Sequence, residues 1–211
     1  MNFGVLVFNE VEELDFVGPW EMLGGWSKTG EGPDKRLIVA QTLDPVVCAN
    51  DLSINPHVSF ENSPALDYLL VPGGHGARRE VNNPALIQFI AEQAKSCKAV
   101  LSVCTGSFLL HAAGLLSGKK ATTYWGSLDR LRALGDVSVV EERYVHDGNV
   151  WTSAGVSAGI DLMLAFIASV SGEEVAGRVQ FYAEYYPSGV NYGDFENSEQ
   201  APAYIKSPER H

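Results

Sequence analysis

The chain has few cysteines and few positive charges. Its 211 residues include three cysteines, Cys48, Cys97 and Cys104, none in a C-x-x-C pair. This pattern argues against a disulfide framework and against a zinc site. Lysine and arginine number 15 against 26 acidic residues, so the formal net charge is −11. We expect neither nucleic acid nor an anionic membrane as a partner, because both bind basic surfaces.

Long hydrophobic runs are also missing. The apolar stretches are far shorter than the roughly 20 residues that a membrane-spanning helix needs. No N-terminal segment joins basic residues to an apolar run, so we expect no signal peptide. With 45% hydrophobic and 19% charged residues, the chain can still bury a substantial core. Together with the cysteine count, these features predict a soluble cytoplasmic protein.

Strand and helix patterns alternate along the chain, which predicts an α/β fold with a mostly parallel sheet. Buried strands are expected over residues 3–8, 37–43, 67–71, 98–103 and 120–124, short antiparallel strands over 46–60, and a hairpin turn at 146–149 within the strand-rich stretch 137–151. Helices are expected over residues 16–23, with Pro19 in the first turn, and over 84–96, 105–114, 158–170 and 173–186. Residues 24–33 read as a Gly-rich loop.

No repeat or linker divides the chain. We therefore predict one α/β domain over residues 1–192. The remaining residues, 193–211, are polar and contain prolines. We expect them to form a peripheral tail.

Cys104 stands where an apolar strand runs into a helix. A thiol at this turn lies at the positive end of a helix dipole, and both the dipole and free backbone N–H groups favour the thiolate. Gly106 keeps side-chain bulk away from the turn, as in nucleophile elbows. The alternative is a buried cysteine that acts as a small hydrophobe. The strand–Cys–helix context favours a reactive thiol.

Asp15 and the pair Gly73–Gly74 also follow predicted strands. Ligands of such sheets bind at the carboxyl ends of the strands, so these residues and Cys104 predict one site. Asp15 has two interpretations, a helix N-cap or an acid–base group. The glycine pair is either a plain turn or a close approach in which the N–H groups of Gly74 and Thr105 stabilise negative charge.

Other polar and aromatic side chains give weaker signals. His57, His111 and His146 have no partners at metal-ligand spacing, and His75 is expected on the rim, so we predict no metal site. Trp20, Tyr124, Trp125 and Trp151 individually read as core residues. One or two of them could instead line an apolar pocket.

Four sequence blocks together resemble the ThiJ/PfpI superfamily. They are Leu14–Glu21 (LDFVGPWE), Leu70–Gly74 (LVPGG), Val103–Ser107 (VCTGS) and Trp151–Gly155 (WTSAG). The resemblance covers residues 2–187. It implies a flavodoxin-like, class I glutamine-amidotransferase-like sandwich with a cysteine on the elbow, and a homodimer.

Two branches of this superfamily share the Asp15 block together with Cys-Thr-Gly. One is isocyanide hydratase, and the other is the sensor half of AraC-type regulators, which continue into a DNA-binding domain. The length and acidity of this chain favour the hydratase branch. Thr105 follows the cysteine and Tyr124 stands where many relatives have a histidine, so neither usual position supplies a Cys–His dyad.

The hydratase resemblance implies conversion of isocyanides to N-formamides through a covalent thioimidate, without a cofactor. Cys104 is then the nucleophile, Asp15 the general acid and base, and Thr105 an orienting group. Trp20, Gly73 and Tyr124 are expected to contact the substrate. Two alternatives stay open: a glyoxalase-like or deglycase-like enzyme acting on a carbonyl, and a non-enzymatic redox-sensing or ligand-binding domain.

Overall fold

A computed structural model describes residues 1–206 as an α/β sandwich built on one seven-stranded sheet. The strand order is β10-β11-β7-β6-β1-β2-β5. Their bounds are Asn2–Leu6 (β1), Lys35–Ala40 (β2), Val58–Ser59 (β5), Tyr68–Val71 (β6), Ala99–Val103 (β7), Tyr144–Asp147 (β10) and Val150–Ser153 (β11). All neighbours pair in parallel except β10, which forms an antiparallel hairpin with β11. The predicted mostly parallel sheet and the hairpin at residues 146–149 are confirmed.

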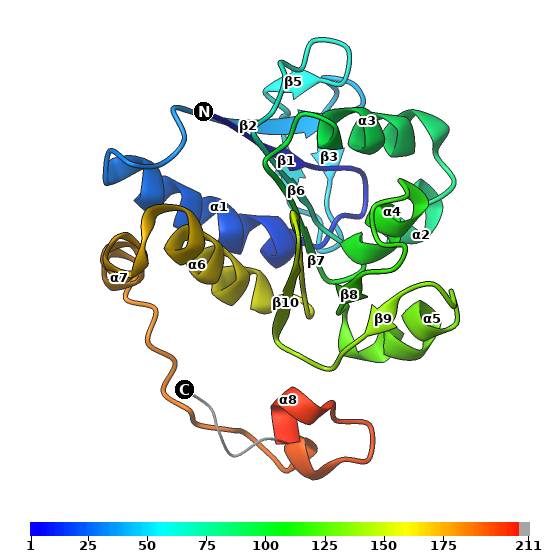
Figure 1. The fold of residues 1–211 in the computed structure, drawn as a ribbon, viewed down its shortest axis with the longest axis vertical. Coiled ribbons are helices and arrows are strands. Elements are labelled where there is room, and N and C mark those ends of the chain that lie inside the picture. The colour runs from blue at the N-terminus through cyan, green and yellow to red at the C-terminus, as the bar shows by residue number, and fades with distance from the viewer. Residues whose placement is uncertain (207–211) are drawn as a thin grey trace.

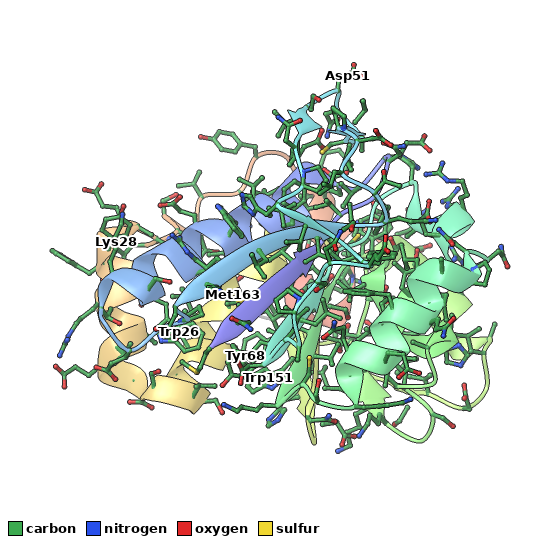
Figure 2. All side chains as sticks on the ribbon, turned by 90° about the horizontal axis from the view of Figure 1, so that it is seen from above. Trp26, Lys28, Asp51, Tyr68, Trp151 and Met163 are labelled. Atoms are coloured by element: carbon green, nitrogen blue, oxygen red, sulfur yellow. The ribbon has the colours of Figure 1, made fainter. Side chains whose placement is uncertain are left out.

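Helices cover both faces of the sheet (Figure 1). One layer holds α1 (Glu13–Lys28), α6 (Ala158–Ser171) and α7 (Glu173–Tyr182); the other holds α2 (Ala77–Glu80), α3 (Pro84–Ala94), α4 (Gly106–Ala112) and α5 (Leu128–Arg132). Smaller elements are the antiparallel pair β3 (Val46–Val47) and β4 (Ser53–Ile54), the parallel pair β8 (Lys120–Ala121) and β9 (Ser138–Val139), the 3-10 turns η1 (Trp125–Ser127) and η2 (Phe195–Asn197), and α8 (Ala203–Lys206). Asp51, at the tip of the β3–β4 hairpin, projects away from the body (Figure 2).

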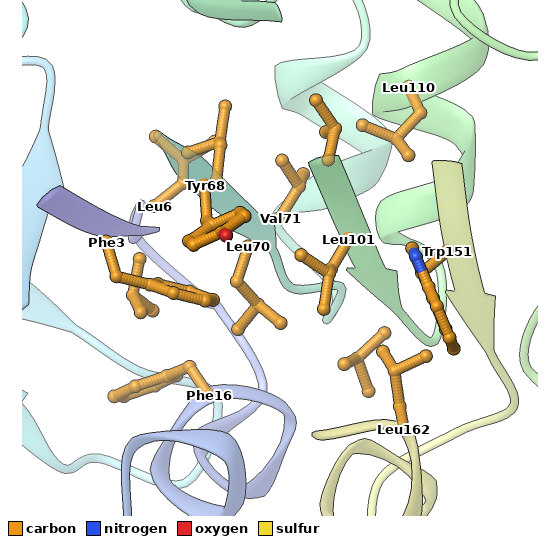
Figure 3. Packing of buried hydrophobic residues seen from close by; sticks show 14 of the residues in the cluster. Phe3, Leu6, Phe16, Tyr68, Leu70, Val71, Leu101, Leu110, Trp151 and Leu162 are labelled. Carbon is orange, nitrogen blue, oxygen red and sulfur yellow. The ribbon is translucent and has the colours of Figure 1, made fainter. Parts of the chain in front are cut away.

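The core fills the space between the sheet and both helical layers. Phe16 and Leu162 reach the sheet from one layer and Leu110 from the other (Figure 3). Strands β1, β6 and β7 are buried along most of their length, as expected for a parallel sheet covered on both faces. β6 and β7 pair in parallel up to Val71 and Ser102, so their carboxyl ends lie side by side at one edge of the sheet.

Helix α1 is longer than the sequence predicted. It starts three residues earlier, at Glu13, and continues through Gly24 and Gly25, so the predicted loop over residues 24–33 begins too soon and Pro19 lies inside the helix. A Cβ on Gly25 would stand 3.0 Å from Val179 Cγ1 of α7. The missing side chain lets the two helices pack closely, and this tertiary contact outweighs the low helix propensity of glycine.

The predicted strand over residues 120–124 is shorter than expected. Only Lys120 and Ala121 pair with β9, and the Thr122 N–H then donates to Thr152 Oγ1 of β11 at 2.9 Å. The side chains of Thr122 and Thr123 are fully buried there. The backbone contact of Thr122 with β11 and the hydrogen bond from Thr123 Oγ1 to the Cys104 carbonyl oxygen replace further strand pairing, and the buried Thr122 hydroxyl group has no hydrogen-bond partner among the described residues.

The segment after α7 leaves the helical layer and returns beneath β9 and β10, where it ends in α8 (Figure 1). Pro202 is buried in this return. The division into a domain over residues 1–192 and a tail over 193–211 stays a prediction, and residues 207–211 of that tail lie outside the described part of the chain. Within residues 1–206, no helix is long and apolar enough to cross a membrane.

Candidate active site

Cys104 occupies a sharp turn between β7 and α4. Its φ is 57°, a left-handed conformation that a residue with a side chain adopts at a cost in energy, and its side chain is nearly buried. A Cβ on Gly106 would stand 2.1 Å from the Val71 carbonyl oxygen. Only glycine fits that position, so the elbow depends on Gly106 as the sequence predicted.

Asp15 lies in the first turn of α1 and is completely buried. Its Oδ2 accepts a hydrogen bond from the Gly73 N–H at 2.8 Å, and its Oδ1 accepts one from the Val156 N–H at 3.1 Å. Glu12 occupies the cap position of the helix, so the N-cap interpretation of Asp15 is wrong. The carboxyl group instead joins the loops after β6 and β11.

Asp15 and Cys104 form an electrostatic pair. Burial is the main reason that the pKa of Asp15 rises to about 8, against partial opposition from the Gly73 N–H. Burial and the charge of Asp15 raise the pKa of the Cys104 thiol well above its ordinary value, although contacts with Thr105 and the Val156 N–H lower it. Hydrogen-bond donors at the turn do lower the pKa of the Cys104 thiol, but burial and the charge of Asp15 raise it by more. The expectation that the turn by itself favours the thiolate needs this correction.

Thr105 connects the elbow to the glycine turn. The Gly74 N–H donates to Thr105 Oγ1 at 3.1 Å, while the Gly73 N–H is taken by Asp15. In this arrangement the Gly74 N–H has a protein partner, and its predicted role in stabilising negative charge stays a prediction. The contacts bring Asp15, Gly73, Gly74, Cys104 and Thr105 together in one site.

Two buried hydroxyl groups that sequence reasoning missed hold the Cys104 backbone. Thr123 Oγ1 donates to the Cys104 carbonyl oxygen at 2.9 Å, and Ser107 Oγ donates to Thr123 Oγ1 at 2.9 Å. Ser107 also reaches the same carbonyl at 3.3 Å. The adjacent threonines at 122 and 123 were the available signal, but a strand pattern hid their inward contacts.

Of the two aromatic residues predicted to contact the substrate, Tyr124 lies beside the site and Trp20 does not. Tyr124 packs beside the site, because a Cβ on Gly155 would stand 2.5 Å from its ring, and Val156 follows directly. The structure does not bring Trp20 there: its ring lies 5.8 Å from that of His57 and 5.6 Å from the Arg36 guanidinium. Five residues of helix carry Trp20 about 7.5 Å along α1 from Asp15 and onto another side.

The four histidines considered in the sequence analysis either contact other groups or are exposed. His57 Nδ1 accepts from the Ile38 N–H, His111 pairs with Asp136, His146 stacks on Trp151, and His75 is exposed. Among residues 1–206, no group of three or more His, Cys, Asp or Glu side chains could hold a metal ion.

The Gly73→Ala substitution tests how tightly the turn fits the elbow. Its Cβ would stand 2.4 Å from Thr105 Oγ1 and 2.5 Å from the Thr105 nitrogen. Because backbone must move, we expect the free energy of unfolding to fall by at least about 2 kcal/mol in chemical denaturation. Gly177→Ala is the matched control, since it is helical and has no atom within 4 Å; it should stabilise by about 0.5–1 kcal/mol. Equal effects would contradict the close fit.

The raised pKa of Asp15 also predicts a pH dependence of stability. Folding moves this pKa from about 3.9 to about 8, so between these values the folded state holds a proton that the unfolded state has lost. This group's contribution is present in full below about pH 4, declines by up to about 1.4 kcal/mol per pH unit, and is lost as the pH rises through about 8. The difference in unfolding free energy, wild type minus Asp15→Asn, should therefore decrease as the pH rises from about 5 to about 8. A flat difference would contradict the shift.

The fold and the site define an α/β protein with a buried cysteine on a strand–helix elbow, facing a buried carboxyl group. A model of the DJ-1/PfpI family matches residues 2–169, and the chain belongs to this family. The predicted ThiJ/PfpI resemblance and flavodoxin-like fold are thus confirmed.

Known relatives include enzymes and regulators. The chain is 39% identical to an isonitrile hydratase of Pseudomonas putida, over 89% of this chain and 80% of that protein. It is 36% identical to the HTH-type transcriptional regulator CdhR of Pseudomonas aeruginosa, over 64% of this chain and 40% of the regulator. A ThiJ/PfpI family protein from Pseudomonas syringae has a similar structure, with a TM-score of 0.84, 35% identity and coverage of 92% of this chain and 79% of that one. Drosophila melanogaster DJ-1beta shares the fold, with a TM-score of 0.77 at 21% identity, over 88% of this chain and 98% of that one.

Proposed function

We propose that this protein hydrates isocyanides to N-formamides, with Cys104 as nucleophile and Asp15 as general acid and base, and without a cofactor. The observation that carries the proposal is the buried pair of Asp15 and Cys104. A carboxyl group whose pKa is about 8 keeps its proton at neutral pH, which is the state that a proton donor needs. The 39% identity to an isonitrile hydratase supports the same substrate class.

The first step joins sulfur to carbon. After the Cys104 thiol has released its proton to solvent, the thiolate bonds to the terminal isocyanide carbon while Asp15 delivers its proton to that carbon, which leaves a thioimidate and an ionised Asp15. Because the charge on Asp15 helps to raise the pKa of the thiol, the thiolate forms most readily while Asp15 is protonated. The contacts with Thr105 and the Val156 N–H also favour the thiolate.

The next steps release the product. Asp15 takes a proton from water as the water oxygen bonds to the carbon, and that proton passes to the nitrogen. The carbon–sulfur bond then breaks, the carbonyl forms, and the hydroxyl proton returns to Asp15. The products are an N-substituted formamide, a thiolate and a protonated Asp15, so the pair ends as it began.

Formation of N-formamide by purified wild-type protein from an aryl isocyanide tests the reaction, with methylglyoxal as a parallel substrate. We expect formamide and no conversion of methylglyoxal. Conversion of methylglyoxal alone would replace the proposal with carbonyl chemistry. No turnover of either, together with oxidation of Cys104 to the sulfinic acid, would replace it with redox sensing.

We also propose a homodimer that acts in the cytoplasm. A groove of about 540 Å³ on the layer of α1, α6 and α7 supports the dimer, and its lining includes Leu14, Val17, Ile160 and Tyr182. A second copy of this face would cover these apolar side chains. Light scattering should give the mass of two chains. Three free cysteines suit the reducing cytoplasm.

A further inference from the structure

The C-terminal segment is fastened close to the active site. The Ala203 N–H donates to Glu141 Oε2 at 2.9 Å, and Glu141 Oε1 accepts from Arg132 Nη2 at 2.7 Å. Pro202 is buried beside this anchor. α8 is thereby held under β9 and β10, far from α7 where the segment begins (Figure 1).

Tyr204 is the aromatic residue of α8, and its side chain is partly buried. Burial raises the pKa of Tyr204 to about 12, and the charges of Arg143, Glu141, Cys104 and Tyr124 also act on it. The anchor of α8 is itself close to the elbow: two residues after Glu141, the Arg143 carbonyl oxygen accepts from the Ala154 N–H at 3.0 Å, and the Ala154 carbonyl oxygen accepts from the Cys104 N–H at 3.1 Å. The Tyr204 hydroxyl group keeps its proton at neutral pH, so the side chain presents an uncharged aromatic surface.

The same region contains the other aromatic side chain of the site. Tyr124 packs against Gly155, and the next residue, Val156, donates its N–H to Asp15. Tyr124 and Tyr204 thus approach the reacting pair from two segments far apart in the sequence. Cys104 itself is only 7% exposed, so a substrate has to pass between groups that cover it.

We propose that α8 closes the entrance to the Cys104 site and that Tyr204 is a specificity-determining residue, which limits the size of the substituent on the isocyanide nitrogen. The inference rests on the proposed hydration of isocyanides. An isocyanide is linear, so when its terminal carbon meets the sulfur its substituent points away from Cys104 toward the cover. A compact apolar substituent fits against the aromatic ring, and a bulky one collides with it.

Substrates of two sizes test the limit. For Tyr204→Ala we expect the ratio of kcat/KM for 2-naphthyl isocyanide to that for cyclohexyl isocyanide to rise about tenfold or more. Tyr204→Phe keeps the ring and should stay within about twofold of wild type. Tyr192→Ala is the matched control, because Tyr192 is in the same segment and 90% exposed. A ratio for Tyr204→Ala equal to that of the control would overturn the size limit.

Alkylation provides a readout that needs no isocyanide. We expect iodoacetamide to modify Cys104 at least about fivefold faster in Tyr204→Ala and in Glu141→Ala, which loses the anchor, than in Tyr192→Ala. Peptide mass spectrometry separates Cys104 from Cys48 and Cys97. Equal rates would overturn closure by α8. Faster alkylation in a protein that shows no hydration would keep the closure and reject the proposed function instead.

Discussion

Replacement of Cys104 by alanine should lower kcat for formamide production by at least about 10⁴-fold while the protein stays folded. The loss is expected to be this large because, in the proposed mechanism, the sulfur forms the covalent bond that divides the reaction into two easier steps. The other two thiols lie elsewhere in the fold: Cys97 donates to the Leu66 carbonyl oxygen ahead of β7, and Cys48 directly follows β3.

Kinetics of wild type, Cys104→Ala and Cys48→Ala with one isocyanide give the comparison. Cys48→Ala removes a buried thiol of the same size and should keep kcat within about twofold. Thermal melting monitored by circular dichroism establishes that all three are folded. Hydration by Cys104→Ala at an appreciable fraction of the wild-type rate would reject covalent catalysis.

The second large effect is expected at Asp15. Asp15→Asn should lower kcat by about 10²–10⁴-fold, the range for loss of a general acid and base. The amide can neither give a proton to the isocyanide carbon nor take one from water. It cannot accept both backbone hydrogen bonds that the carboxyl group accepts from Gly73 and Val156, so one donor also loses its partner.

Alkylation separates the proton-transfer role of Asp15 from simple damage to the site. Above about pH 8, where Asp15 is ionised and its charge raises the pKa of Cys104, the neutral asparagine should increase the thiolate fraction, and iodoacetamide should modify Cys104 at least as fast as in wild type. Glu13→Gln is the control, because Glu13 shares the first turn of α1 but binds Asn50. An Asp15→Asn variant with undiminished turnover would remove Asp15 from the mechanism, and slower alkylation would indicate a distorted elbow.

Much of the fold was predictable from local patterns. The strand before Gly73 is a continuous apolar run and the strand before Cys104 is apolar except for Ser102, and short apolar runs bounded by turn residues predict buried strands directly. The same patterns located the carboxyl ends where Asp15, Gly73 and Cys104 meet. α1 was misjudged because glycine propensity is local, whereas the close contact of Gly25 with Val179 is tertiary.

The site was only partly predictable, for the same reason. The hydratase resemblance led us to expect Trp20 in contact with the substrate, but α1 turns its ring toward His57. The hydrogen bond from Thr123 Oγ1 to the Cys104 carbonyl oxygen joins residues 19 positions apart. Tyr204 lies 100 residues beyond Cys104. The balance between elbow donors and burial at the thiol likewise depends on packing, which no local pattern records.

Mass spectrometry of the acid-quenched protein during turnover tests the central claim most directly. With cyclohexyl isocyanide, we predict that wild type gains the mass of one isocyanide on the peptide that carries Cys104, and that Cys104→Ala gains none. Formamide production with the added mass on another peptide, or with an equal adduct on Cys104→Ala, would contradict a Cys104 thioimidate.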